Sequence, residues 1–336
     1  MIFTSRACLA VVAVALVLTG CTPAAAGQDP PASPGPVEST PPLADAIDPP
    51  GPRVPLDCDE LVPDADELGF TPGRPRGVID IDSARLVQGG VTECSWTSAD
   101  NRSLWVTLFP DFPEAVSHVQ PGCQWYSASG VWSCDSDKMV GSVVLSVSGE
   151  PGDDVVDQAS ADAWLAAIEA HASAAITAAG LLPPWDGPQA TLPSEVFASL
   201  DVATVAGIFD VPPSGVVLAP QERLGGAGIS LTHSSDYVWG EATGARWATA
   251  KVLPAGAWAL DEFMTSEAAP WQEKRDYQPA SIDGLDRTVM TTGSGYSEAC
   301  GAIGDDLLCV TSVQTDLDAF VTSVEEFVAL LGDADR

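Results

Sequence analysis

Side chains capable of catalysis are present in this sequence, but not at the spacings that known mechanisms require. The three histidines, His118, His171 and His233, lie far apart, and none belongs to the His-Glu-x-x-His pattern that places two zinc ligands on one helix face. No Gly-x-Ser-x-Gly run places a serine nucleophile on a strand-to-helix turn. These observations favour a protein that is not an enzyme.

Acidic and glycine clusters are the next candidates. Acidic neighbours at 64–67, 153–154 and 305–306 could bind calcium or form a catalytic carboxylate pair. With 47 Asp and Glu residues such neighbours arise by chance, and no calcium-loop spacing occurs. The glycines at 225–228 and 293–295 lack the lysine of a phosphate-binding loop. We therefore expect solvated surface and loops, without a cofactor or a metal site.

The cysteines predict an exported protein with disulfides. Of the eight cysteines, Cys8 and Cys21 lie within or next to an N-terminal leader, which leaves an even number without the Cys-x-x-Cys spacing of zinc sites. Outside the cell such a set is expected to oxidise, although spacing alone leaves many pairings open. Two pairs have loops short enough for neighbouring strands, Cys123 with Cys134 and Cys300 with Cys309, and Cys58 with Cys94 would tie the opening helix to the hairpin.

Two of the ten tryptophans flank a short cysteine loop. Trp125 and Trp132 lie between Cys123 and Cys134. Exposed together, their rings could stack on a sugar or hold an apolar ligand, which makes them candidate ligand contacts. The competing interpretation is ordinary packing in a sheet, since aromatic residues are common on strands.

The N-terminus predicts a lipid anchor. Arg6 precedes an apolar run over 7–18, which is too short to span a bilayer and is typical of a signal peptide. Leu18, Thr19, Gly20 and Cys21 resemble a bacterial lipobox. We expect residues 1–20 to be removed, and Cys21 to carry fatty chains such as palmitate on the outer face of the cell membrane. Ordinary secretory cleavage near 24–26 is the alternative.

Charge limits the partners. The formal net charge is −33, and Lys138, Lys251 and Lys274 are the only lysines. Nucleic-acid affinity depends largely on Lys and Arg neutralising phosphates, so nucleic-acid binding is excluded. Anionic lipid headgroups are disfavoured for the same reason.

The remaining chain predicts a tether followed by a duplicated module. Residues 21–55 are proline-rich and form an extended tether. Residues 56–180 and 193–333 form two related domains joined by a linker at 181–192. The marker of the repeat is a pair of tryptophans bracketing a polar turn in each half, Trp96 with Trp105 and Trp239 with Trp247, and each pair predicts a β-hairpin.

Each copy is expected to follow the order helix, three strands, helix, three strands, helix. This order favours α+β domains, each an antiparallel sheet packed with helices. Cys134 is aligned with Cys300, which requires an insertion around 265–281 in the second copy. The expected helices are at 58–68, 112–119, 164–179, 193–209, 258–264 and 317–331, and the strands that follow each hairpin are at 125–127, 131–134, 140–148, 287–292, 296–300 and 307–314.

A family resemblance covers the whole chain. The lipobox-like junction, the proline-rich tether, Leu-Asp-Cys-Asp-Glu-Leu at 56–61, Cys-Ser-Trp at 94–96 and the terminal amphipathic helix together resemble the uncharacterised cell-surface lipoproteins common in actinobacteria. Some of these are similar to extracellular sensor modules of bacterial membrane kinases. The second half departs from the pattern by having Tyr237 where the first half has Cys94. The resemblance implies a membrane anchor and supplies no catalytic residues.

Three functions are compatible with these features. The favoured one is a non-enzymatic surface module that binds a small ligand, an envelope polymer or a partner protein. A structural accessory subunit of an envelope complex is the second. A hydrolase is the third.

Overall fold

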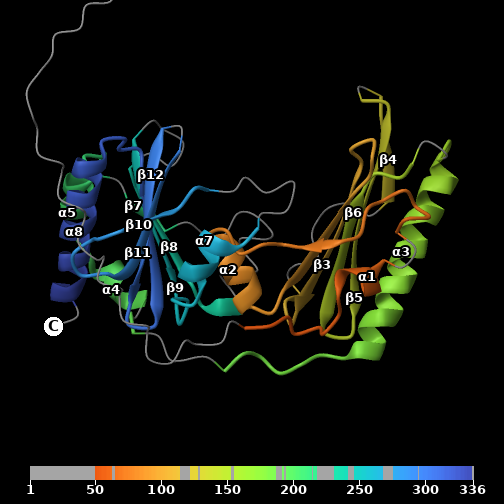
Figure 1. Ribbon diagram of the computed structural model, residues 1–336, viewed down its shortest axis with the longest axis horizontal. Helices are drawn as coiled ribbons and strands as arrows, with labels where there is room; N and C mark the ends of the chain where they lie inside the picture. Colours follow the sequence, from red (N-terminus) through yellow and green to blue (C-terminus); the bar gives the residue numbers. More distant parts are fainter. Residues whose placement is uncertain are drawn as a thin grey trace, which may run out of the picture. The chain divides into compact units, whose positions relative to one another are not determined.

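The computed structural model contains two antiparallel sheets with helices packed against them (Figure 1). It describes residues 50–62, 65–113, 122–127, 129–152, 155–186, 191–192, 194–213, 215–217, 231–240, 246–267, 275–293 and 295–334. The expected signal peptide, Cys21, most of the tether and His118 lie outside these ranges. None of the described helices combines the length and apolar character needed to cross a membrane.

The first sheet has six strands in the order β1-β2-β3-β6-β5-β4. Its strands are β1 (Arg74–Pro75), β2 (Thr92–Thr97), β3 (Ser103–Pro110), β4 (Gly122–Tyr126), β5 (Val131–Val140) and β6 (Val143–Gly149). One face packs against α1 (Cys58–Leu61) and α3 (Gln158–Ala179). The core between them includes Trp96, Leu104, Val106, Leu145 and Val147 from the strands and Leu165, Ile168, Ala172 and Ile176 from α3.

The second sheet has seven strands in the order β10-β11-β12-β13-β9-β8-β7. Its strands are β7 (Gly215–Val217), β8 (Ser235–Gly240), β9 (Trp247–Leu253), β10 (Gln278–Ala280), β11 (Asp286–Gly293), β12 (Tyr296–Ile303) and β13 (Asp306–Ser312). Read from β7, this order reproduces that of the first sheet and adds β10 at the far edge. The expected fold class, two related α+β modules in tandem, is therefore confirmed.

Both predicted hairpins are present, but only one tryptophan of each pair is equivalent. Trp96 lies opposite Leu104 in the first hairpin, and Trp239 lies opposite Ala248 in the second. Both of these tryptophans are buried. Trp105 comes directly after Leu104, whereas Trp247 comes directly before Ala248. These two rings therefore occupy different positions in their hairpins.

The alignment of Cys134 with Cys300 is wrong. In the first sheet, Leu104 lies opposite Trp96, Gly149 lies opposite Leu104, and Cys134 lies opposite Gly149. In the second sheet, Ala248 lies opposite Trp239, Ser312 lies opposite Ala248, and Ser297 lies opposite Ser312. Cys134 therefore corresponds to Ser297. A shift of three residues reverses the face of a strand, which explains why the two cysteines lie in cores of different character.

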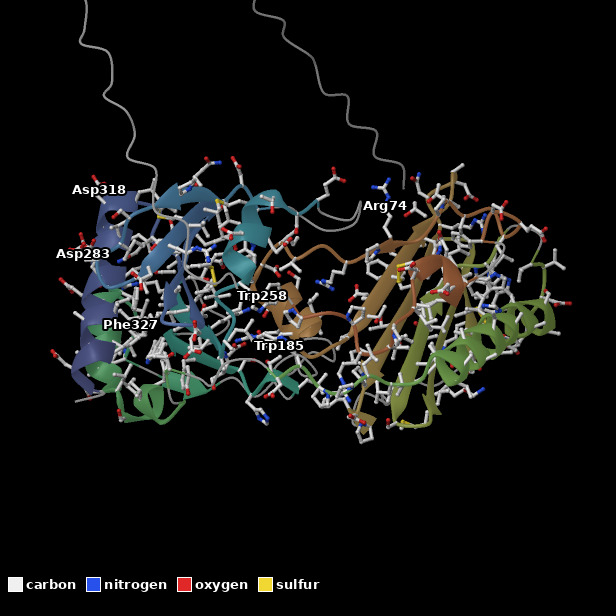
Figure 2. All side chains as sticks on the ribbon, turned by 60° about the horizontal axis from the view of Figure 1, so that its bottom comes forward. Arg74, Trp185, Trp258, Asp283, Asp318 and Phe327 are labelled. Atoms are coloured by element: carbon white, nitrogen blue, oxygen red, sulfur yellow. A yellow bond between two sulfur atoms is a disulfide. The ribbon has the colours of Figure 1, made fainter. Side chains whose placement is uncertain are left out.

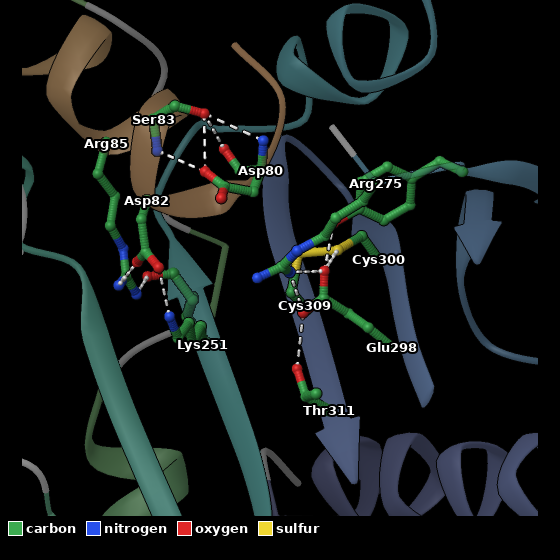
Figure 3. The surroundings of a disulfide bond; sticks show 12 residues. Asp80, Asp82, Ser83, Arg85, Lys251, Arg275, Glu298, Cys300, Cys309 and Thr311 are labelled. Atoms are coloured by element: carbon green, nitrogen blue, oxygen red, sulfur yellow. Dashed lines mark hydrogen bonds and ion pairs between the residues drawn. A yellow bond between two sulfur atoms is a disulfide. The ribbon is translucent and has the colours of Figure 1, made fainter. Parts of the chain in front are cut away.

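The three disulfides are those expected from the sequence. Cys58 binds Cys94, Cys123 binds Cys134, and Cys300 binds Cys309. The last two connect residues that lie directly opposite each other on neighbouring antiparallel strands. Figure 3 shows the Cys300–Cys309 bond on the second sheet.

The opening helices differ from expectation. The helix expected at 58–68 is the single turn α1, and the one expected at 193–209 is two helices, α4 (Ser194–Ser199) and α5 (Val202–Ile208). Asp201 separates them because its side chain accepts from the amide of Thr204 at 2.9 Å and begins a new helix. The helix expected at 112–119 falls largely outside the described residues.

A helix that the sequence analysis does not predict, α2 (Ile81–Gln88), begins at a capping box. The Asp80 carboxylate accepts from the amide of Ser83 at 2.8 Å, and the Ser83 hydroxyl accepts from the amide of Asp80 at 3.0 Å. Gly89 and Gly90 follow its last turn, and Gly90 has a positive φ of 73°. These two signals, an Asp-x-x-Ser start and a Gly-Gly end, could have identified the helix.

Helices cover both faces of the second sheet. On one face α4, α5 and α8 (Leu317–Ala334) pack, and Phe327 of α8 lies among the aromatic rings of that core (Figure 2). On the other face α7 (Ala259–Thr265) packs together with α2, which contributes Ile81 and Ala84 to the core. Part of the second sheet is thus covered by a helix from the first half of the chain.

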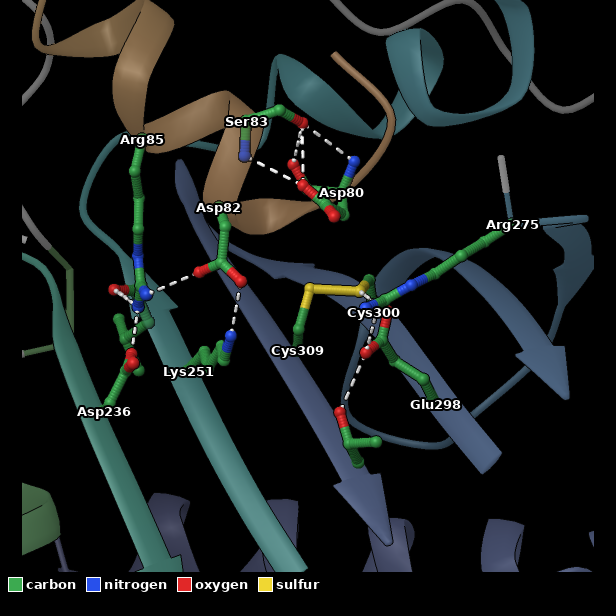
Figure 4. A network of polar contacts seen from close by, with 12 residues as sticks. Asp80, Asp82, Ser83, Arg85, Asp236, Lys251, Arg275, Glu298, Cys300 and Cys309 are labelled. Carbon is green, nitrogen blue, oxygen red and sulfur yellow. Dashed lines mark hydrogen bonds and ion pairs between the residues drawn. A yellow bond between two sulfur atoms is a disulfide. The ribbon is translucent and has the colours of Figure 1, made fainter. Parts of the chain in front are cut away.

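Charged side chains join α2 to β8 and β9 (Figure 4). Arg85, which is almost fully buried, pairs with Asp236 and donates to the carbonyl oxygens of Ser235 and Val252. Lys251 donates to Asp82 at 2.6 Å. Burial raises the pKa of Asp82, but the charges of Lys251 and Arg85 outweigh this effect and hold the pKa below its usual value. The carboxylate therefore stays charged in mildly acidic solution, and its contribution to stability is lost only as the pH falls through that lowered pKa.

The buried carboxylate of Asp306 holds the chain in place where the second half begins. Asp306 is fully buried and accepts three backbone amides, from Thr191 at 2.7 Å, Leu192 at 2.5 Å and Ala255 at 2.7 Å. It connects the chain before α4 to the end of β9. Asp306, one of the acidic neighbours considered above, thus has a structural role.

Replacing Asp306 with Ala should lower the free energy of unfolding by at least about 3 kcal/mol, because three amides lose their acceptor. Asp306→Asn keeps one acceptor oxygen and should cost less. Urea unfolding followed by circular dichroism measures both values. Equal stability of Asp306→Ala and the unsubstituted protein would contradict this role.

Candidate functional site

The candidate site is an open pocket on the first sheet, built around Trp125 and Trp132. Trp125 on β4 lies directly opposite Trp132 on β5, and their ring centroids are 5.6 Å apart with the planes at 60°. Trp125 keeps 52% of its surface exposed, and the neighbouring Tyr126 keeps 50%. The packing interpretation is therefore wrong for Trp125, whose ring faces solvent.

The β4–β5 hairpin that carries the tryptophans is held at several points. Its turn closes with a bond from the amide of Gly130 to the carbonyl oxygen of Tyr126 at 2.8 Å, and Gly130 has a positive φ of 70° that suits glycine. The Cys123–Cys134 disulfide crosses the same two strands two residues away. Gln158 of α3 donates to the carbonyl oxygen of Cys123 at 2.8 Å. The rings are thus presented from a fixed backbone.

The other walls come from two neighbouring segments. The segment after β6 contributes Pro151, Gly152, Val155 and Val156, and the β2–β3 turn contributes Asp100 and Arg102. The pocket has a volume of about 820 Å³, within the usual range for small-ligand sites. Val156 is 80% exposed, so an aliphatic side chain lies beside the aromatic ones in contact with water.

Asp100 and Arg102 form a fixed polar wall. Arg102 donates through Nε to both oxygens of Asp100, at 3.0 and 2.8 Å, and its guanidinium lies 5.2 Å from the ring centre of Phe70. The Ser98 hydroxyl also donates to Asp100. The hydrogen bond from Ser98 is the main cause that lowers the pKa of Asp100, and the hydrogen bond from Arg102 lowers it further. At neutral pH the pocket therefore offers a charged, oriented acceptor.

Other residues considered from the sequence do not come together. His171 contacts the carbonyl oxygen of Glu60 at 3.0 Å, and His233 lies just before β8. Asp153, Asp154 and residues 225–228 lie outside the described part. In the ranges that the structure describes, no group of three or more His, Cys, Asp or Glu side chains could hold a metal ion.

The walls of the pocket were missed by sequence reasoning. Asp100 lies in a turn that was predicted, but nothing in the sequence indicates that this turn approaches the segment after β6. The Asp-x-Arg spacing is a weak local signal for an ion pair at the end of a hairpin. The positions of the other pocket walls depend on packing between residues far apart in the sequence.

Fold and pocket define an α+β protein with two related antiparallel sheets and an exposed aromatic pocket on the first. No protein-family model matches the chain, and no curated protein matches it. Among solved structures, it matches the crystal structure of DynU16, a protein of the dynemicin biosynthetic locus, at 14% identity over 79% of this chain and 97% of that chain. The TM-score is 0.15, so the match carries no argument about fold or function.

Acrylamide quenching should detect the exposure of Trp125. The Trp125→Phe variant is expected to lose a larger share of its quenchable tryptophan fluorescence than Trp132→Phe, because the ring of Trp125 is the more exposed of the two. Phenylalanine preserves the aromatic contact and serves as a mild substitution. An identical quenching constant for Trp125→Phe and the unsubstituted protein would show that the pocket is closed in solution.

Proposed function

We propose that this protein is a lipid-anchored, extracytoplasmic module that binds a glycan of the cell envelope without catalysing a reaction on it. The observation that carries the proposal is the exposed Trp125 ring beside the Asp100–Arg102 pair in an open pocket. A sugar ring has an apolar C–H face that packs on an indole and hydroxyl groups that bond to charged side chains. The pocket supplies both kinds of contact.

The charge of the chain favours an uncharged glycan. With a formal charge of −33, the surface repels polyanions such as phosphate-rich polymers. Within the pocket, Arg102 is paired with Asp100 through Nε and its Nη1 is buried, so its charge is poorly placed to bind an acidic sugar. A neutral sugar polymer meets neither obstacle.

Binding without catalysis is the simplest use of this pocket. Glycoside hydrolysis generally needs two carboxyl groups about 5–10 Å apart on either side of the scissile bond. Among the described residues that line the pocket, Asp100 is the one acidic side chain. It is engaged by Ser98 and Arg102, which hold it ionised and unsuited to donate a proton.

Export and anchoring are supported by two independent features. The Leu-Thr-Gly-Cys junction at 18–21 follows an apolar run of signal-peptide length. The three disulfides are expected to persist in an oxidising compartment outside the cytosol. The proline-rich tether at 21–55 would carry the folded part away from the membrane surface and into reach of envelope polymers.

Loss of the exposed ring should abolish most glycan binding. Trp125→Ala is expected to weaken binding to insoluble cell-wall polysaccharide by roughly tenfold or more, because the stacking surface for the sugar is removed. The measurement is a depletion assay with purified walls. Met139→Ala is the matched control, since Met139 is an exposed apolar side chain on the same strand β5 as Trp132 but near its other end. Undiminished binding by Trp125→Ala would refute the proposed site.

The anchor has its own test. Cys21→Ala removes the thiol that would carry the acyl chains, so the protein should appear in the culture medium instead of the membrane fraction. Immunoblots of the two fractions measure the distribution. A mutant that still pellets with membranes at the level of the unsubstituted protein would contradict acylation at Cys21.

A further inference from the structure

The lining of the pocket combines two features that a plain hexose would not use together. Asp100 is an acceptor, and Val155 and Val156 form an aliphatic surface in the same pocket. Val156 is 80% exposed, although aliphatic side chains usually gain from burial. A ligand that carries an N–H donor next to a methyl group would satisfy both features.

The acceptor capacity of Asp100 is nearly filled. An ionised carboxylate has about four acceptor positions. Ser98 donates to one oxygen, the single N–H at Arg102 Nε is shared between both oxygens, and the backbone amide of Asp100 also bonds to its own carboxylate. Roughly one position is therefore left, which suits the single N–H of an amide better than the three donors of an ammonium group.

The charge of Asp100 is also already balanced. The Arg102 guanidinium is bound to the carboxylate and lies over the Phe70 ring, so it is fixed in place. A second cation next to this pair would gain little from Asp100 and would be repelled by Arg102. At an ionic strength that screens the overall charge of −33, an uncharged donor is therefore favoured in the pocket over a free amino group.

We propose that the pocket selects 2-acetamido sugars, with Trp125 under the pyranose ring, Asp100 accepting the acetamido N–H, and Val156 covering the acetamido methyl group. This inference rests on the proposed glycan-binding function and narrows its ligand class. Glucose units lack the methyl group and leave Val156 in water. Glucosamine units place an ammonium group next to the balanced ion pair.

Three tetrasaccharides with the same β-1,4 linkage separate these ligands: those of N-acetylglucosamine, glucose and glucosamine. Isothermal titration calorimetry of the folded, disulfide-bonded chain should give about tenfold tighter binding of the N-acetylglucosamine tetramer than of either other tetramer, from one buried methyl group and one amide hydrogen bond. Equal or tighter binding of the glucose or glucosamine tetramer would overturn the inference and leave glycan binding standing. Failure to bind all three tetramers and isolated cell walls would overturn the inference and the proposed function together.

A single substitution tests the role of the aliphatic wall. Val156→Ser should reduce the preference for the N-acetylglucosamine tetramer to about threefold or less, while the dissociation constant for the glucose tetramer stays unchanged. The fold should not be affected, because Val156 is largely exposed, and an unchanged melting temperature checks this. Met139→Ala should leave the preference intact. A Val156→Ser variant with the full preference would show that the methyl group does not lie against this side chain.

Discussion

The contact of the buried Arg85 guanidinium with strands β8 and β9 is the interaction on which the arrangement of the second sheet depends. This sheet is apolar on both faces, and each face needs a cover. Helix α2, which belongs by sequence to the first half, covers part of one face, and Arg85 fixes it there through Asp236 and two strand carbonyl oxygens. Removing one partner of such a buried pair leaves an uncompensated charge, so the contact strongly constrains how α2 can sit.

This arrangement links the candidate site to the rest of the described chain through α2. Sheet one presents the pocket, and α2 contacts this sheet as well, because Leu86 packs with Phe109 and Val144. The hairpin with Trp125 and Trp132 is braced separately by the Cys123–Cys134 bond and by α3. A ligand therefore meets a surface whose side chains are already positioned, and little ordering cost is added on binding.

Much of the fold follows from local signals in the sequence. The closing helices α3 and α8 were predictable because their apolar side chains recur at helical spacing, and the hairpins were predictable from alternating strands around polar turns. The Cys123–Cys134 and Cys300–Cys309 disulfides followed from their short loops, since opposite positions on neighbouring strands are close in sequence, whereas Cys58–Cys94 was predicted as a link between the opening helix and the hairpin. In the site, Trp125 and Trp132 stood out because they flank a short cysteine loop.

Other features depend on contacts distant in sequence. The register that separates Cys134 from Cys300 is set by the ladder through β6 and β13, which no local pattern encodes. Helix α2 has clear capping signals, but its apolar side chains fit a sheet more than a hundred residues later in the chain. The approach of Asp100 to the segment after β6 likewise results from sheet packing. The strand register, the packing of α2 and the position of Asp100 could therefore be determined only from the three-dimensional structure.

Native-state hydrogen exchange tests the central claim that α2 joins the two halves into one cooperative unit. The slowest amides of the first sheet and of the second should exchange with the same free energy and the same denaturant dependence, because unfolding either sheet exposes the apolar and charged contacts of α2. If one sheet loses its protection at a free energy several kcal/mol below the other, α2 does not couple them and the account is contradicted.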